Sequence, residues 1–132
     1  MEIHLKITGI LLIALALIHF SFPKYFNWKQ ELSSLSIMNR QMMYVHSFFI
    51  ALIILLMGIF WLYSTDDIQH TNIGRQVAFG LFIFWGIRLL FQFMVYSPKL
   101  WLGKWLETIV HIFFSFLWAY FTAVFLLIYL EK

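Results

Sequence analysis

Residues 50–62 read Ile-Ala-Leu-Ile-Ile-Leu-Leu-Met-Gly-Ile-Phe-Trp-Leu, a run without any charged or hydrogen-bonding side chain except the indole of Trp61. With its flanking turns, the helix that we expect covers residues 39–63. That length exceeds the roughly 20 residues that an α-helix needs to cross a bilayer. Similar segments occupy residues 3–22, 73–96 and 103–130. The pattern predicts four membrane-spanning helices.

The composition supports this class. Of the 132 residues, 63% are hydrophobic and only 11% are charged, whereas about a quarter of the residues in a soluble domain are charged. So few charges cannot cover a water-facing surface, which indicates a multi-pass integral membrane protein with the lipid bilayer as its main partner. The chain has no cysteine, which excludes disulfides, thiolate catalysis and cysteine-based metal sites. No glycine-rich phosphate loop is present, so we expect no binding of nucleotides or nucleic acid.

The links between the four segments are short. Ser64 to Asn72 is a polar loop, and Ser97-Pro98-Lys99 is a turn. Short links between spans favour antiparallel neighbours, so we expect an all-α, antiparallel four-transmembrane-helix bundle that forms a single domain over residues 1–132. We expect the first span to be retained, because Ser21-Phe22-Pro23 lacks the small-residue pattern of a signal-peptide cleavage site.

The linker between spans one and two has an interfacial character. Residues 24–38 combine Tyr25 and Trp28 with Lys24 and Lys29. Aromatic rings beside lysines are typical of the lipid headgroup zone, so the linker predicts a short helix lying on the membrane surface. Asn27 is a candidate cap for this helix, with Gln30 three positions later.

The charge distribution predicts the orientation. Four spans place both termini on one side of the membrane. That side has three basic residues and the opposite side has five: Lys6, Arg75 and Lys132 against Lys24, Lys29, Arg40, Lys99 and Lys104. The positive-inside rule then places both termini on the non-cytoplasmic side.

The strongly polar residues of the spans fall in one half of the membrane, on the side of the residue 24–38 linker. They are His19, His46, Arg88, Gln92, Glu107 and His111. At about 1.5 Å per residue, Arg88 and His111 are each roughly 12 Å deep, and Gln92 and Glu107 roughly 6 Å. Ionisable residues in a membrane span face the protein interior or a cavity and usually have a function. The sequence therefore predicts a polar site in this half.

Histidines on different helices with a nearby carboxylate resemble the donor set of a metal or haem centre, because imidazole binds haem iron and divalent metals. The candidate cofactor- or metal-binding residues are His46, His111, Glu107 and His19. The predicted supporting polar layer is Arg88, Gln92, Asn39, Tyr44 and Ser115. The expected cofactor is haem or a divalent metal ion, although no specific motif such as His-Glu-x-x-His is present.

A purely structural interpretation stands beside this one. Arg88 and Glu107 would form a buried ion pair that fixes the third span against the fourth, because each charge needs a partner in hydrocarbon. His46 and His111 would then hydrogen-bond between helices, with Gln92, Ser47 or Ser115 as their partners.

Three functions fit the pattern. The first is a metal- or haem-binding redox protein or enzyme that acts on a lipid-soluble substrate. The second is a proton-coupled carrier of small molecules, in which the same residues titrate. The third is a non-catalytic membrane subunit or scaffold in which the polar layer only packs the helices. A homo-oligomer or a larger membrane complex is compatible with each.

Overall fold

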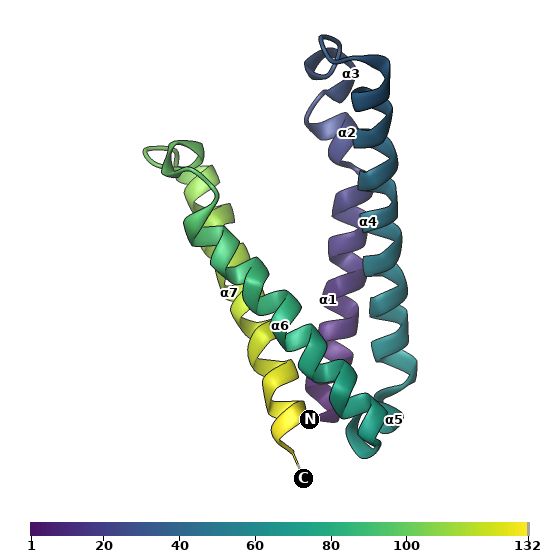
Figure 1. Cartoon of the computed structure of the whole chain (residues 1–132). Helices are drawn as coiled ribbons and strands as arrows, with labels where there is room; N and C mark the ends of the chain where they lie inside the picture. Colours follow the sequence, from purple (N-terminus) through teal and green to yellow (C-terminus); the bar gives the residue numbers. More distant parts are fainter. Residues whose placement is uncertain (132) are drawn as a thin grey trace. The chain divides into compact units, whose positions relative to one another are not determined.

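The computed structural model describes residues 1–131, and every regular element within them is a helix (Figure 1). The four long helices are α1 (Glu2–Phe20), α4 (Ile37–Tyr63), α6 (Asn72–Met94) and α7 (Trp105–Leu130). The short ones are α2 (Phe22–Tyr25), α3 (Trp28–Glu31), α5 (Thr65–His70) and the 3₁₀ turn η1 (Pro98–Leu100). Each long helix is long and apolar enough to cross a membrane. This confirms the four apolar spans that the sequence predicts.

Four helix ends differ by two residues from the expected boundaries, at Phe20, Ile37, Met94 and Trp105, and two of these have a clear local cause. α1 ends at Phe20, and Pro23 lies in the first turn of α2, where a backbone N–H would have no intrahelical acceptor and its absence costs no hydrogen bond. α7 begins at Trp105, because Gly103 has a φ of 78° and Lys104 is extended. Gly103 and Lys104 thus belong to the turn before the fourth span.

The linker after α1 forms two one-turn helices, α2 and α3, where a single short helix was expected. Asn27 is the N-cap residue of α3, with a left-handed φ of 52°, but its side chain bonds no backbone N–H. Instead its Nδ2 donates a hydrogen bond of 3.1 Å to Gln30 Oε1. The location of these helices on a membrane surface stays a prediction.

The chain divides into two compact units. Residues 3–65 contain the α1–α4 hairpin, and residues 66–131, with residues 1–2, contain the α6–α7 hairpin. The two long helices of each hairpin run antiparallel (Figure 1). Each hairpin is therefore a packing unit of its own, and the four-helix bundle stays a prediction.

In the α1–α4 hairpin the two backbones approach closely at a pair of glycines. A Cβ atom on Gly9 would lie 2.8 Å from the carbonyl oxygen of Gly58, and a Cβ on Gly58 would lie 2.8 Å from that of Gly9. Small residues permit such close approach of membrane helices. Towards the linker, Phe20 and Phe48 pack edge to face, with centroids 5.8 Å apart.

In the α6–α7 hairpin two indoles set the register. Trp85 of α6 stacks on Trp118 of α7, with centroids 5.3 Å apart and planes 11° from parallel. Trp85 also contacts the ring of Phe121 at 4.9 Å. Trp85 is 2% exposed, Trp118 is 4% exposed and Phe121 is fully buried. This cluster forms the centre of the hairpin.

The far end of the same hairpin is closed by Arg75. Its Nε and Nη2 donate hydrogen bonds of 3.3 and 3.0 Å to the carbonyl oxygen of Tyr129. The guanidinium also lies 5.8 Å from the centroid of the Tyr129 ring. The last carbonyls of a helix have no partner within it, and a cation there favours the helix dipole. Arg75 therefore caps the C-terminus of α7.

Replacing Arg75 with methionine keeps the length of the side chain but removes this cap. We expect a loss of about 1 kcal/mol of stability, because an exposed charge-assisted hydrogen bond contributes about that much. Thermal unfolding in detergent, followed by tryptophan fluorescence, measures it. Arg40→Met is the matched control, since the guanidinium of Arg40 has no hydrogen-bond or ion-pair partner within residues 1–131. Equal melting temperatures for the two variants would contradict the capping role.

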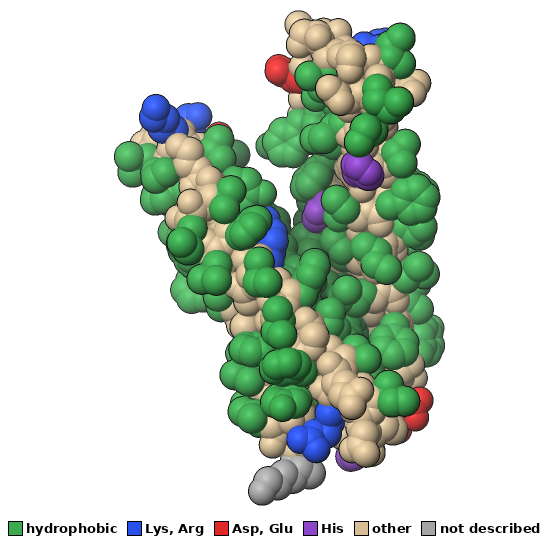
Figure 2. Space-filling view, in the orientation of Figure 1, with side chains coloured by type: hydrophobic (Ala, Val, Ile, Leu, Met, Phe, Trp, Pro, Cys, Tyr) green, Lys and Arg blue, Asp and Glu red, His purple; other side chains and the backbone are tan. Residues whose placement is uncertain are grey.

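The surface of each hairpin is mostly apolar. Hydrophobic side chains cover most of the visible length of the helices, and acidic groups gather at helix ends (Figure 2). Large side chains are exposed along all four spans, among them Leu17, Ile53, Phe93 and Phe116, at 61%, 56%, 62% and 73%. A surface of this kind suits hydrocarbon rather than water.

Candidate functional site

The amide of Gln92 is the centre of a polar network between α6 and α7. Gln92 is 6% exposed. Its Oε1 accepts a hydrogen bond of 3.2 Å from Trp118 Nε1 and a longer one of 3.4 Å from Arg88 Nη1. Its Nε2 lies 3.0 Å from His111 Nδ1. We call Arg88, Gln92, His111 and Trp118 the Gln92 network.

The network assigns the proton on His111. Indole and guanidinium groups only donate hydrogen bonds, so the amide atom that faces Trp118 and Arg88 must be the oxygen of Gln92. The amide nitrogen then faces His111 and donates to Nδ1, which must carry a lone pair. The proton of the neutral imidazole is therefore on Nε2. In this tautomer His111 offers an N–H donor and has no free lone pair for a metal.

Aromatic rings surround the two basic side chains. The imidazole of His111 stacks on Trp101 at 4.7 Å with planes 15° from parallel, and Phe93 meets it edge-on at 5.9 Å. The guanidinium carbon of Arg88 lies 4.8 Å from the centroid of a Trp118 ring and 5.3 Å from that of Tyr96. Cation–π contacts are strongest where water is excluded. Rings therefore hold the guanidinium of Arg88, together with one hydrogen bond to Gln92.

The expected ion pair between Arg88 and Glu107 is wrong. Within residues 1–131 no ion pair joins them, and Glu107 is exposed in the first turn of α7, where the helix dipole favours a carboxylate. The register explains the difference. Gln92 lies opposite His111 and Trp85 opposite Trp118. Continued along the hairpin, this register sets Glu107 level with Tyr96, about 12 Å or two turns beyond Arg88.

The remaining predicted residues of this hairpin are placed as follows. Glu107 forms no bond with His111, although the two lie one turn apart. The hydroxyl of Ser115 donates to the carbonyl oxygen of His111 at 2.8 Å, so it serves its own helix and not the imidazole. Of the three partners considered for His111, the structure selects Gln92.

The other predicted site residues belong to the α1–α4 hairpin. His46 is exposed, and so is Asn39, whose backbone N–H is bonded to Ser36 Oγ in the first turn of α4. His19 and Tyr44 are half-buried and line a pocket of this hairpin. The proposed ligands are thus divided, with His19 and His46 in one unit and Glu107 and His111 in the other.

No group of three or more histidine, aspartate or glutamate side chains placed to hold a metal ion occurs within residues 1–131. The metal or haem centre stays a prediction. Of the four proposed ligands of that centre, His111 is the weakest candidate. The lone pair on its Nδ1 already accepts a hydrogen bond from Gln92, whereas a ligating histidine binds the metal with one ring nitrogen and normally donates the N–H of the other to a neighbouring acceptor.

Sequence reasoning missed the role of Trp118. Its seven-residue spacing from His111 places it on the same helix face, and that was the available signal. The neighbours of Trp101, Lys99 and Lys104, are typical of an interfacial aromatic belt and give no sign of a contact with His111. Its stacking on His111 could not be read from the sequence, because it depends on the path of the turn between α6 and α7.

Comparison of the chain with known protein families, with curated proteins and with solved structures gives no match.

Proposed function

We propose that this multi-pass membrane protein binds the anionic head group of a lipid-soluble molecule at Arg88. The observation that carries the proposal is the guanidinium of Arg88, which lies among aromatic rings within a membrane-spanning helix without a carboxylate partner in the described part of the chain. His111, oriented by Gln92, supplies a second donor to the same region.

The acidic residues of the chain do not supply a negative charge that would pair with Arg88. All six lie in the first turn of a long helix, at a C-terminal cap or in the short helices: Glu2, Glu31, Asp66, Asp67, Glu107 and Glu131. Arg88 lies about 9 Å from the end of α6. Arginine at the centre of a span costs about 2.5–3.5 kcal/mol in insertion scales. A bound anion would offset that cost.

The donors also match an anion. Arginine has five N–H groups, and one of those on Arg88 bonds Gln92. The others have no acceptor within residues 1–131, and neither has Nε2–H of His111. A carboxylate or phosphate presents several acceptor oxygens and pairs with guanidinium in a bidentate geometry. The rings of Tyr96 and Trp101 provide apolar surface beside these donors.

Native mass spectrometry of the detergent-purified protein tests the proposal. Wild-type protein is offered oleate, dioleoylphosphatidylglycerol or the zwitterionic dioleoylphosphatidylcholine. We expect at least one of the two anionic amphiphiles to bind about tenfold or more tightly than the zwitterionic lipid, because hydrogen bonds to charged groups contribute about 1.5–3 kcal/mol. Preference for oleate identifies a free fatty acid as the source, and preference for phosphatidylglycerol identifies a phospholipid.

Arg88→Met should reduce binding of the anion to the level of the zwitterionic lipid, and Arg88→Lys should retain part of it because the charge remains. Arg75→Met is the matched control, since Arg75 lies at the other end of the same helix and is engaged by Tyr129. Unchanged anion binding in folded Arg88→Met protein would overturn the proposal, and it would favour a scaffold in which the network only packs helices.

The same preparation separates this proposal from the predicted metal or haem function. A Soret absorption band, or a stoichiometric metal that disappears in His111→Phe, would support the metal or haem function and contradict the tautomer on which the anion proposal relies. Proton-coupled transport would instead appear as uptake into liposomes that depends on a pH gradient.

A further inference from the structure

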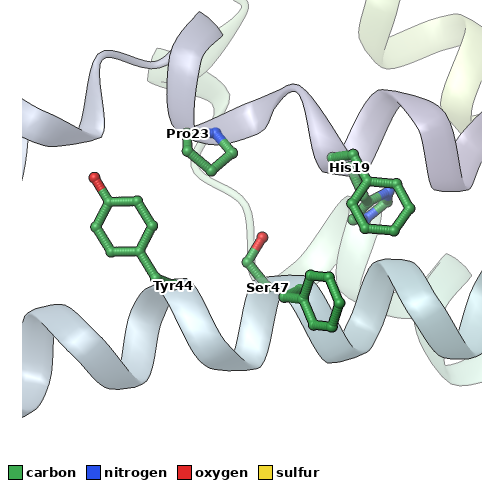
Figure 3. A pocket seen from close by; sticks show the side chains of 6 residues that line it. His19, Pro23, Tyr44 and Ser47 are labelled. Atoms are coloured by element: carbon green, nitrogen blue, oxygen red, sulfur yellow. The ribbon is translucent and has the colours of Figure 1, made fainter.

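The α1–α4 hairpin contains a pocket of about 290 Å³ at its linker end. Six residues line it: His19, Phe20, Pro23, Tyr44, Ser47 and Phe48 (Figure 3). All six belong to one compact unit. We propose that this pocket binds the hydroxyl head of a neutral amphiphile, such as a fatty alcohol or an acylglycerol, and that it does so independently of Arg88.

The imidazole of His19 lines the pocket and has one ring nitrogen available as a hydrogen-bond acceptor. Its Nδ1 lies 2.8 Å from the carbonyl oxygen of Leu15. A carbonyl oxygen only accepts, so Nδ1 carries the proton and donates it. The neutral ring therefore has its lone pair on Nε2. The ring is held in place by Phe22, whose centroid is 4.7 Å away, and Nε2 has no acceptor or donor partner within residues 1–131.

Ser47 presents a second polar group. Its hydroxyl points from α4 towards the junction of α1 and α2, between His19 and Pro23 (Figure 3). The hydroxyl bonds neither its own helix nor the linker, in contrast to Ser115 and Thr122 of α7, which both donate to carbonyls one turn back. Tyr44 adds a third polar group, a hydroxyl that is directed away from Ser47 (Figure 3). Polar groups in a membrane helix usually find a partner.

The chemistry of the lining selects a neutral hydroxyl. No charged side chain lines the pocket, so an ionic head would lack a counter-charge. A hydroxyl can donate to His19 Nε2 and accept from Ser47 at once, which an ether or ester cannot. Phe20 and Phe48 pack against each other at 5.8 Å and give an apolar wall.

The size and position of the pocket fit the head and first carbons of such a molecule. Its volume of about 290 Å³ is at the lower limit of the roughly 300–1,000 Å³ of small-molecule sites. Ser47 lies about 15 Å along α4 from Ile37, and the neighbouring linker has the lysines and aromatic rings of a headgroup zone. The hydrocarbon chain of the bound molecule would extend along the exposed apolar surface of the hairpin.

Photolabelling of the 132-residue protein in phosphatidylcholine nanodiscs tests the inference. The probe is octadecanol with a diazirine on its chain, and its methyl ether is the matched control because it accepts but cannot donate a hydrogen bond. We expect the alcohol to label peptides from residues 15–26 and 44–50 at least threefold more than the ether, and excess unlabelled octadecanol to suppress that labelling.

Ser47→Ala should lower the labelling by the alcohol towards that of the ether, and His19→Phe should lower it further. Ser115→Ala makes the same exchange in another span and should leave the labelling by the alcohol unchanged. Arg88→Met should also leave it unchanged. If the His19→Phe protein does not fold, the effect of Ser47→Ala and the ratio of alcohol to ether labelling still test whether the pocket binds a hydroxyl head. Equal labelling by alcohol and ether, or labelling insensitive to Ser47→Ala, would overturn the inference, whatever the result for anions at Arg88.

Discussion

Replacing Gly58 with leucine is expected to separate α1 from α4 and to lower the melting temperature by about 10 °C, which corresponds to about 3 kcal/mol of overpacking in a chain of this size. A Cβ atom at this position would lie 2.8 Å from the carbonyl oxygen of Gly9 and 3.1 Å from the backbone nitrogen of Ile13. Backbone atoms cannot rotate away as a flexible side chain can, so the helices must move apart.

Two measurements check the expected result. Thermal unfolding in detergent gives the change in stability. Because the chain has no cysteine, a Phe20→Cys and Phe48→Cys pair reports the proximity of α1 and α4 through a short bismaleimide cross-linker without background. Cross-linking should fall in the Gly58→Leu protein.

Gly80→Leu is the matched control, the same exchange in another span. Apart from its chain neighbours and the backbone of its own helix, a Cβ on Gly80 would have no heavy atom of residues 1–131 within 4 Å. We therefore expect an unchanged melting temperature, or a slight rise from the better helix propensity of leucine. Equal melting temperatures of the Gly58→Leu and Gly80→Leu proteins would refute a close glycine contact between α1 and α4.

Replacing Gln92 is expected to produce the second large effect. In Gln92→Leu, the indole N–H of Trp118, the guanidinium of Arg88 and Nδ1 of His111 would all lose their partner. A buried polar group left without a hydrogen bond costs about 1–3 kcal/mol, so we expect a loss of at least about 3 kcal/mol. Gln76→Leu, an exposed glutamine of the same helix, should have little effect in the same unfolding assay.

Gln92→Glu tests the assigned tautomer. The carboxylate still accepts from Trp118 and Arg88 but has no N–H to donate to His111. We therefore expect the His111 proton on Nε2 in the wild-type protein and on Nδ1 in the variant, and ¹⁵N NMR shifts of the imidazole distinguish the two. A wild-type proton on Nδ1 would contradict the assignment. The new carboxylate should also compete for Arg88 and weaken anion binding.

The sequence contained most of the information on the spans. The bilayer requires about 20 apolar residues for each helix, and runs such as residues 50–62 satisfy this requirement without reference to any neighbour. Polar residues such as Gln92 and His111 also stand out in the sequence, because a polar side chain in hydrocarbon costs free energy and is rare in a membrane span. Both properties are local, so a single chain read in order suffices to find them.

The partners of those polar residues were decided by the tertiary structure alone. Depth counting set Arg88 level with His111 and Gln92 level with Glu107, but the helix–helix register depends on the turn that contains Gly103 and on the stacking of Trp85 on Trp118. The stacked indoles belong to different helices, so their contact cannot be read from either segment alone. A displacement of about one turn changes no local property of the sequence, yet it sets Gln92 opposite His111 and moves Glu107 away from Arg88. Arg88 then lies among aromatic rings, where we propose that it binds an external anion.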